Sequence, residues 1–379
     1  MSLSPNEIDP DGLLEYSVVF TDRSLNHMSK AFQEVMRDIH AGLTEVYQAH
    51  TAVVVPGGGS IAIEAVARQF ATDKSALVVR NGWFSYRWSQ VFEAGGVPAS
   101  TRVMMAERTA DRPDAPFAPP PVESVVAAIK ADAPDVVCAA HVETSAGLIL
   151  PDSYLKALAD AAHDVGALFI LDCVASGCIW VDMAATGVDV LISAPQKGWS
   201  ASPCAGLVML SERATKVLGE TKSSSFALDL AKWHAIMQAY TSGGHAYHAT
   251  MPTDALRQFR DALFETRAFG FQEAHDAQRT LGERVRGLME QRGYQSVAAD
   301  GFKAPGVVVS YTDDPQKKSG AVFAANGMQV AAGVPLEIGE GADFSTFRIG
   351  LFGIDKLQNV ERTVERLGDV LGKVEAQAA

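Results

Sequence analysis

The sequence predicts an α/β protein in which a large domain, with a mostly parallel central sheet flanked by helices, precedes a smaller C-terminal α+β domain. Between about residues 50 and 210, short apolar runs alternate with helical stretches, as in parallel strands joined by crossover helices. After residue 250 a long helical stretch leads into more widely spaced apolar runs. The 379 residues also exceed what one hydrophobic core usually supports, which favours two domains.

Five apolar runs are expected to be strands buried on both faces, because they lack the polar alternation of a half-exposed strand. These runs are AVVVP (52–56), SALVVR (75–80), DVVCAAH (135–141), ALFILD (167–172) and DVLIS (189–193). Helices are expected between them at 60–70, 122–132 and 152–166. Crossovers of this kind are right-handed and give a mostly parallel sheet.

The region after residue 250 is expected to form the smaller domain. More than one helix is expected over 253–293, strands over 306–312, 328–333 and 347–352, and a final helix over 355–375. We therefore divide the chain into an N-terminal arm over 1–20 that packs near the functional site, a large domain over 21–268 and a small domain over 269–379.

Composition and charge exclude several classes of function. The formal net charge of −13 argues against binding to nucleic acid or to anionic membranes, because both need a concentrated basic face. The polar, acidic start is neither a signal nor a transit peptide, and no apolar run approaches the roughly 20 residues that span a bilayer. The four cysteines lack metal or redox spacing, so buried reduced thiols and a cytoplasmic location are expected.

Three of the expected strands end in residues suited to ligand binding. PGGGS (56–60) follows the first strand directly before a helix, so its backbone and the free N–H groups of the helix form a cup for a phosphate. ALFILD ends in Asp172, and DVLIS is followed by APQK, which carries Lys197. Because the carboxyl ends of parallel strands share one edge of the sheet, these features are expected to meet there.

An anion cup, a carboxylate and an isolated lysine together have a specific chemical meaning. Pyridoxal phosphate needs a phosphate site, an amine for a Schiff base and a carboxylate that keeps its pyridine nitrogen protonated. The pattern GxGxxG is not met and the P-loop lysine is missing, which disfavours NAD and nucleoside triphosphates. The small residues around Lys197 are interpreted as room for a flat ligand. An ordinary glycine turn, and a capping or turn role for Asp172, are the alternatives.

Six segments also occur in the order of a known family, from about residue 50 to the C-terminus. They are PGGGSIAIEAV (56–66), HVETSAG (141–147), LDCVASG (171–177), SAPQKGWSASPCAG (193–206), YHATMP (247–252) and FRIGLFG (347–353). The chain thus resembles the class V aminotransferases of pyridoxal-phosphate fold type I, and within them the alanine–glyoxylate / serine–pyruvate aminotransferase group. The resemblance implies transfer of an amino group from a small amino acid of the alanine or serine type to glyoxylate, pyruvate or a similar 2-oxo acid by a ping-pong mechanism.

Carried over position by position, the resemblance implies roles for residues of this chain. Lys197 would be the Schiff-base lysine and would move the proton, and Asp172 would pair with the pyridinium nitrogen. The other implied cofactor contacts are Gly58, Gly59 and Ser60 at the phosphate, Gln196 at the ring hydroxyl, Thr144 beside the ring, and Phe84 stacked on it with Trp83 as the alternative.

The resemblance also implies a homodimer with shared active sites. Tyr247 and Thr250 would reach across the interface to the phosphate bound by the partner subunit, with a simple loop role as the alternative. Arg348 would hold the substrate carboxylate in a two-pronged salt bridge, a geometry that suits arginine, and a structural ion pair is its alternative.

The chain departs from the family pattern near the substrate. FTDRSLNHM (20–28) stands where the family has a Gly-Pro-Gly-Pro turn, so Asp22, Arg23 and Asn26 are candidate pocket residues. Arg23 would receive a second acidic group of the substrate, and a surface charge is its alternative. The phosphate cup has Gly58 where the family often has serine, so backbone N–H groups are expected to contribute more.

Other activities remain as alternatives at this stage. A lyase or aldolase on the same scaffold is the main one, whereas a cysteine desulfurase is disfavoured because it needs a C-terminal cysteine and the last one here is Cys204. A non-catalytic relative is expected to lack Lys197 or Asp172. No metal is expected, because His245 and His248 have no further ligand at useful spacing.

Overall fold

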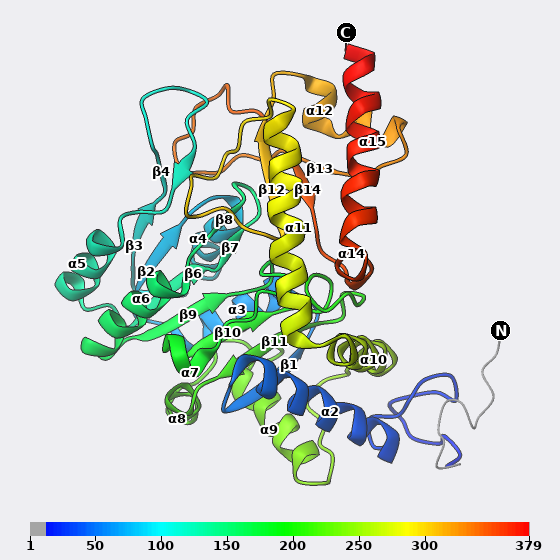
Figure 1. Ribbon diagram of the computed structural model, residues 1–379. Helices are drawn as coiled ribbons and strands as arrows, with labels where there is room; N and C mark the ends of the chain where they lie inside the picture. Colours follow the sequence, from blue (N-terminus) through cyan, green and yellow to red (C-terminus); the bar gives the residue numbers. More distant parts are fainter. Residues whose placement is uncertain (1–12, 379) are drawn as a thin grey trace.

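The continuous apolar runs form a seven-stranded central sheet in the computed structural model, which describes residues 13–378 (Figure 1). Residues 1–12 of the predicted N-terminal arm lie outside the described residues. The strands are β1 (Thr51–Pro56), β2 (Ser75–Arg80), β3 (Ser100–Met105), β6 (Val136–Ala140), β9 (Leu168–Asp172), β10 (Val190–Ser193) and β11 (Ala205–Leu210). The spatial order of the seven strands is β1-β11-β10-β9-β6-β2-β3. All five predicted strands are among them, as β1, β2, β6, β9 and β10.

One strand of this sheet runs against the others. β11 is antiparallel to both of its neighbours, β1 and β10, whereas the pairs from β10 to β3 are parallel. β1 therefore points in the same direction as β10. The predicted mostly parallel sheet is confirmed, and the carboxyl ends of all strands except β11 lie at one edge.

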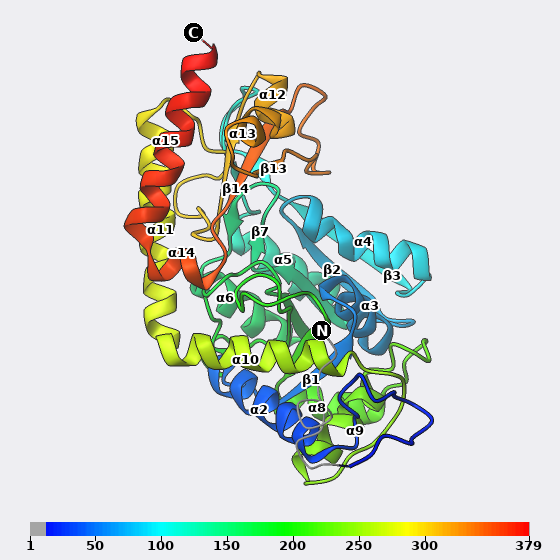
Figure 2. The same ribbon diagram turned by 90° about the vertical axis from the view of Figure 1, so that its right-hand side faces the viewer.

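Helices cover both faces of the sheet. α3 (Gly59–Phe70) and α4 (Trp83–Gly95) lie on one side of it and α5 (Val122–Asp132) and α6 (Asp152–Asp164) on the other (Figure 2). The remaining helices of this part are α2 (Lys30–Tyr47), α7 (Met183–Thr186), α8 (Glu212–Glu220), α9 (Leu230–Thr241) and α10 (Thr253–Phe269). α2 and α9 pack at the β1 edge. From β1 through β2 to β3 the chain moves toward one edge of the sheet, and from β3 through β6 to β9 it moves back. Because the crossovers are right-handed, α3 and α4 lie on one face and α5 and α6 on the other.

The C-terminal part has a separate three-stranded antiparallel sheet in the order β12-β14-β13. Its strands are β12 (Val307–Tyr311), β13 (Ala331–Ala332) and β14 (Thr346–Gly350). The helices are α11 (Phe271–Gln291), α12 (Pro315–Ser319), α13 (Ala321–Ala325), α14 (Ile354–Gln358) and α15 (Val360–Ala378). α11 and α15 lie side by side (Figures 1 and 2).

Two predictions for this part differ from the structure. The strand expected over 328–333 is only two residues long, and the single final helix is two helices separated at Asn359. The stretch 253–293 does contain two helices, α10 and α11, which meet at Gly270. Buried residues such as Leu281, Phe347 and Leu371 form a core of their own here. The predicted domain boundary at residues 268 and 269 stays a prediction.

The segment that precedes α2 packs against a distant loop. The ring of His27 lies with its centroid 5.8 Å from that of His245 and 5.4 Å from that of Tyr247. The divergent segment 20–28 therefore lies beside the loop that carries Tyr247 and Thr250. Within residues 13–378, no helix is both long enough and apolar enough to cross a membrane.

The loop that carries Lys197 packs backbone to backbone against a second loop. A Cβ on Gly198 would lie 2.1 Å from the carbonyl oxygen of Gly177, and Gly177 itself has a φ of 65°. Both positions therefore require glycine for reasons of packing and backbone conformation. This contact gives a packing reason for glycine at position 198, and the interpretation that the small residues beside Lys197 make room for a flat ligand stays a prediction.

Candidate active site

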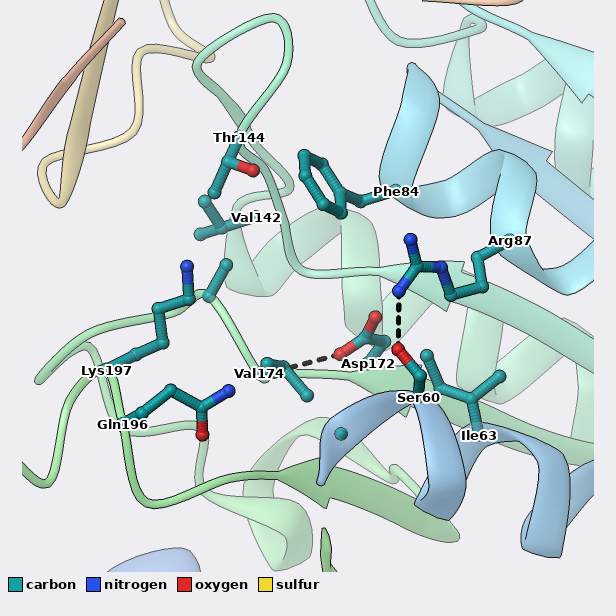
Figure 3. Close-up of a pocket in the computed structure, with 12 residues that line it drawn as sticks. Ser60, Ile63, Phe84, Arg87, Val142, Thr144, Asp172, Val174, Gln196 and Lys197 are labelled. Atoms are coloured by element: carbon teal, nitrogen blue, oxygen red, sulfur yellow. Dashed lines mark hydrogen bonds between the residues drawn. The ribbon is translucent and has the colours of Figure 1, made fainter. Parts of the chain in front are cut away.

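A cavity opens at the carboxyl edge of the central sheet, where residues from five separate segments meet (Figure 3). It is lined by Gly59, Ser60, Ile63, Phe84, Arg87, Val142, Thr144, Asp172, Val174, Ala175, Gln196 and Lys197. The cup, the carboxylate and the lysine that the strand ends suggested are thus brought together around one space.

The N-terminus of α3 forms one wall of this cavity. No side chain caps the helix, so its first N–H groups are left for a ligand beside Gly59 and Ser60. A Cβ on Gly59 would lie 2.6 Å from Cγ2 of Val174, so glycine lets the helix start close to the β9 loop. Gly58 is the N-cap residue, and its carbonyl accepts hydrogen bonds from Ile61 and Ala62, but it does not line the cavity.

Arg87 enters the same cup from α4 and was missed by the sequence reasoning. Its Nη1 donates to Oγ of Ser60, and its charge lowers the pKa of Asp172 (Figure 3). Arg87 makes no ion pair with any carboxylate in the described part of the chain. It follows Phe84 by three residues, which puts both side chains on one face of a helix, and that spacing is the signal that would have found it.

Asp172 lies at the last position of β9, and its side chain is buried, with the residue only 7% exposed. Burial raises the pKa of Asp172 to about 6; the Val174 N–H, which donates to Oδ1 at 2.9 Å, acts against this rise, and the Glu143 charge adds to it. The charges of Arg87 and Lys197 also act against the rise. The carboxyl group is therefore ready to accept a charged N–H from a ligand.

Lys197 lies in the loop after β10, and its neighbour Gln196 has a buried Oε1 with no hydrogen-bond partner in the described residues. Burial lowers the pKa of Lys197, as does the nearby charge of Arg348, whereas Asp172 raises it. The Nζ atom lies 5.2 Å from the ring centroid of Phe352. A lowered pKa increases the fraction of neutral amine, which is the nucleophilic form.

Phe84, and not Trp83, faces the cavity. Phe84 lines it from the first turn of α4, whereas the ring of Trp83 packs against that of Tyr86 at a centroid distance of 5.9 Å. Thr144 lies on the neighbouring wall (Figure 3). Of the two aromatic residues considered for stacking on the cofactor, only Phe84 lines the cavity.

Arg348 lies beside the cavity rather than in its lining. It belongs to β14, its Nε donates to the carbonyl of Ala332 at 2.8 Å, and its guanidinium carbon lies 5.7 Å from the ring centroid of Phe84. Burial lowers the pKa of Arg348, and the Glu143 charge acts against this. Across residues 13–378 no carboxylate forms an ion pair with Arg348, so the structural ion pair is not found and the Nη atoms are left for an anion.

The other candidate residues do not reach this cavity within one chain. Tyr247 is 51% exposed, and its hydroxyl lies 3.0 Å from that of Thr250, but neither residue lines the space. Arg23 is exposed in the segment before α2 and also lies outside the lining. His141, the first residue of the HVETSAG segment, is 1% exposed and does not line the cavity; its Nδ1 lies 2.7 Å from Oγ of Ser176. Burial, with a smaller effect of Arg279, lowers its pKa to about 3, so the ring is neutral.

The fold has the architecture of the fold type I pyridoxal-phosphate enzymes, as comparison with solved structures shows. The alanine–glyoxylate aminotransferase of Nostoc sp. aligns with a TM-score of 0.75 and 24% identity over 91% of this chain and 88% of that one. The ureidoglycine–glyoxylate aminotransferase of Bacillus subtilis aligns with a TM-score of 0.77 and 23% identity over 98% and 92%.

Sequence comparison then gives the family. The profile of the family "Aminotransferase class-V" matches residues 13–333, and the chain belongs to this family. Among its relatives, the 2-aminoethylphosphonate–pyruvate transaminase of Paraburkholderia phymatum is 29% identical over 360 residues, which cover 92% of this chain and 90% of the relative. The enzyme of the same name from Vibrio vulnificus is 26% identical over 342 residues, covering 89% and 88%.

The burial of Asp172 predicts a specific pH dependence of stability. In the ligand-free protein the Asp172 carboxyl group has a pKa of about 6, above the value of 3.8 expected for the unfolded chain. Its contribution to stability is complete below pH 3.8 and is lost as the pH rises through 6. Asp172→Asn removes this loss. We therefore expect the free energy of unfolding of the variant to exceed that of the native protein by up to about 3 kcal/mol at pH 8 and by less at pH 5.

Urea unfolding of both ligand-free proteins at the two pH values measures this difference. Asn keeps the oxygen that accepts the Val174 N–H, so the substitution changes little besides the ionisable group. An equal difference at pH 5 and pH 8, or a variant that is less stable at pH 8, would contradict the expected burial cost.

Proposed function

We propose that this aminotransferase uses pyridoxal 5'-phosphate and exchanges an amino group between a small amine donor and a short 2-oxo acid. The observation that carries the proposal is the position of Lys197 and Asp172 on neighbouring strand ends beside an uncapped helix N-terminus. This donor set fits the cofactor, which when bound supplies an electron sink that stabilises negative charge on the α-carbon of the substrate.

Each polar group at the cavity fits one part of the cofactor. The N–H groups of Gly59 and Ser60, together with Arg87, hold the phosphate, and Gly58 completes this turn. Asp172 pairs with the ring nitrogen, which explains a buried carboxylate without an ion pair. The unpartnered Oε1 of Gln196 accepts a hydrogen bond from the ring hydroxyl.

The remaining wall residues orient the ring and the substrate. Phe84 stacks on the ring, and Thr144 lies beside it. Lys197 would hold the cofactor covalently through its Nζ atom, and as a free amine the same atom would accept and return the proton at the α-carbon of the substrate. Arg348 binds the carboxylate of the 2-oxo acid with its two free Nη atoms.

The relatives narrow the choice of substrates. Enzymes named for 2-aminoethylphosphonate and pyruvate are similar over nearly the whole chain, which supports pyruvate or the related glyoxylate as the acceptor. The proposed donor is a small amine, either an amino acid of the alanine or serine type or an aminophosphonate. Lyase chemistry is less well supported, since none of these relatives is named as a lyase.

The absorption spectrum tests the proposal directly. Added pyridoxal phosphate is expected to give a long-wavelength band through its covalent attachment to Lys197. Alanine, serine or 2-aminoethylphosphonate is then expected to convert this band to a shorter-wavelength one while one equivalent of the matching oxo product forms. In Lys197→Ala the band is absent and turnover falls by at least about 1000-fold, whereas Lys232→Ala, which removes an exposed lysine, behaves as the native protein.

Two outcomes count against this function. A protein that gives no band with added cofactor does not bind it at Lys197. A band that persists with every donor while ammonia or a fragmented product forms indicates a lyase.

Arg348 is expected to determine affinity for the 2-oxo acid. Arg348→Lys keeps a positive charge but loses the two-pronged geometry, so the KM for pyruvate is expected to rise by about 100-fold with a smaller change in kcat. Steady-state kinetics with pyruvate and glyoxylate measure both constants. An unchanged KM for both acids would place the carboxylate site elsewhere.

We further propose a homodimer in which Tyr247 and Thr250 complete the phosphate site of the partner subunit. The two side chains are exposed, their hydroxyl groups are hydrogen-bonded to each other, and neither lines the cavity of its own chain. Because segment 20–28 packs beside them through His27, the same arrangement would carry Arg23 toward the partner's substrate pocket.

Mixing two defective variants tests the shared site. Alone, Lys197→Ala gives no covalent cofactor, and the double variant Tyr247→Phe/Thr250→Val is expected to bind cofactor at least about 10-fold more weakly. A mixed dimer combines the intact lysine of one chain with the intact hydroxyl groups of the other in one of its two sites. We expect that site to recover native cofactor affinity after refolding of the mixture. No recovery, or a monomer in sedimentation experiments, would contradict the shared site.

A further inference from the structure

Glu143 is a buried acidic residue that lies next to the cavity but does not line it. It ends β7 (Val142–Glu143), it is 1% exposed, and no cation forms an ion pair with it among the described residues. A buried carboxylate without a cation is costly unless hydrogen-bond donors surround it. The position of those donors therefore shows what the residue holds in place.

Both oxygens of Glu143 accept hydrogen bonds, and most of the donors belong to the start of α4. Oε1 accepts from the N–H of Phe84 at 3.2 Å and from the N–H and hydroxyl of Ser145 at 3.1 and 2.7 Å. Oε2 accepts from the N–H of Ser85 at 2.8 Å and lies 2.7 Å from its hydroxyl. Five donor atoms thus surround the two oxygens, counting the Ser85 hydroxyl, which also lies 2.9 Å from the carbonyl oxygen of Gly82.

The side chains of Glu143 and Ser145 thus accept hydrogen bonds from the first N–H groups of α4. The N–H of Trp83, which precedes Phe84, donates to Oγ of Ser145 at 3.0 Å. The negative charge also lies at the N-terminal end of the helix dipole, where it is favourable. A Cβ on Gly82 would lie 2.2 Å from Oγ of Ser145 and 2.8 Å from Cγ of Glu143, so glycine at this position permits the close approach.

The two segments that this carboxylate joins form two of the walls of the proposed cofactor cavity. α4 carries Phe84 and Arg87 into the cavity, and the turn formed by residues 143–145 carries Thr144, which stands between Glu143 and Ser145 (Figure 3). A change in the contacts of Glu143 would therefore alter the separation of these walls. It would also move Arg87 relative to Ser60, to which Arg87 is bonded.

We propose that Glu143 is a positioning residue for the cofactor: through the first turn of α4 it sets the distance between Thr144 and the pair Phe84 and Arg87. The inference rests on the proposed function, since it concerns the same ligand. It goes further in assigning cofactor affinity to a side chain that does not line the cavity.

Glu143→Gln tests the assignment while keeping the shape of the side chain. The amide NH₂ must face either the Phe84 and Ser145 donors or the Ser85 N–H, so at least one N–H of the first turn loses its acceptor. We expect the dissociation constant of pyridoxal phosphate, measured by titrating the ligand-free protein and following quenching of tryptophan fluorescence, to rise by about 10- to 100-fold.

Asp189→Asn is the matched control. Asp189 is equally buried, at 2% exposure, and its carboxylate accepts from the Phe169 N–H at 2.9 Å and pairs with His163 and Arg213. It does not line the cavity, so its substitution is expected to lower stability without changing cofactor affinity. A rise in the dissociation constant in Glu143→Gln but not in Asp189→Asn separates positioning from a general loss of stability.

A double-mutant cycle tests whether Glu143 affects cofactor affinity through the first turn of α4. If Glu143 acts through the first turn of α4, its substitution changes affinity less in a Phe84→Leu background than in the native one. Equal effects in both backgrounds, or an unchanged dissociation constant in Glu143→Gln, would overturn the proposal. If the native protein itself fails to bind the cofactor, the proposed function fails instead.

Ser145→Ala covers the case in which Glu143→Gln does not fold. It removes the acceptor of the Trp83 N–H and one donor to Glu143 while leaving the carboxylate in place. The expected rise in the dissociation constant is smaller, about 3-fold. A native dissociation constant in Ser145→Ala together with a misfolded Glu143→Gln would show that the network stabilises the fold alone.

Discussion

The constraint on which the site depends is the closeness of two side chains of opposite charge: Asp172, buried at the end of β9, and Lys197, half-buried in the loop after the neighbouring strand β10. Burial disfavours the charged form of each, so it raises the pKa of Asp172 and lowers that of Lys197. Their mutual attraction acts against both shifts without reversing either. A ligand that brings a charged N–H to the carboxylate and a reactive carbon to the amine would remove the free-energy cost of burying these two groups. Relief of this cost would then contribute to the free energy of ligand binding.

The proposed anion cup depends on how closely α3 packs against the sheet. A Cβ on Gly206 of β11 would lie 2.3 Å from the Cβ of Ala62, and one on Gly59 would lie 2.6 Å from the side chain of Val174. Gly206 pairs with Val55 of β1, so the helix that follows β1 lies directly over the one antiparallel strand of the central sheet. Without side chains at these two glycines, the first turn of α3 is held at a fixed place, as a preorganised phosphate site requires.

The strand-end residues could be predicted from the sequence because their signals are local. Asp172 ends one apolar run and Lys197 comes shortly after another, and the edge that they share follows from the parallel sheet alone. β3 was not predictable in this way, because it is largely exposed and has no continuous apolar run. Glu143 is a different case, since its partners Phe84 and Ser85 lie 59 and 58 residues earlier in the chain. Its role depends on how α4 packs against a turn, and no local pattern reports that packing.

If Arg348 binds the substrate carboxylate, as proposed, it also links substrate binding to the pKa of Lys197. Its positive charge is one of the causes that lower the pKa of Lys197, and no carboxylate of residues 13–378 forms an ion pair with it. When the substrate carboxylate binds there, as proposed, it screens that charge and the pKa of the lysine rises. On the proposed function, the lower pKa would favour covalent attachment of the cofactor to Lys197 before the substrate binds, and the higher pKa would favour acceptance of the α-carbon proton afterwards. Arg348 could influence both steps because its charge, on β14, acts on the side chain of Lys197 in the loop after β10.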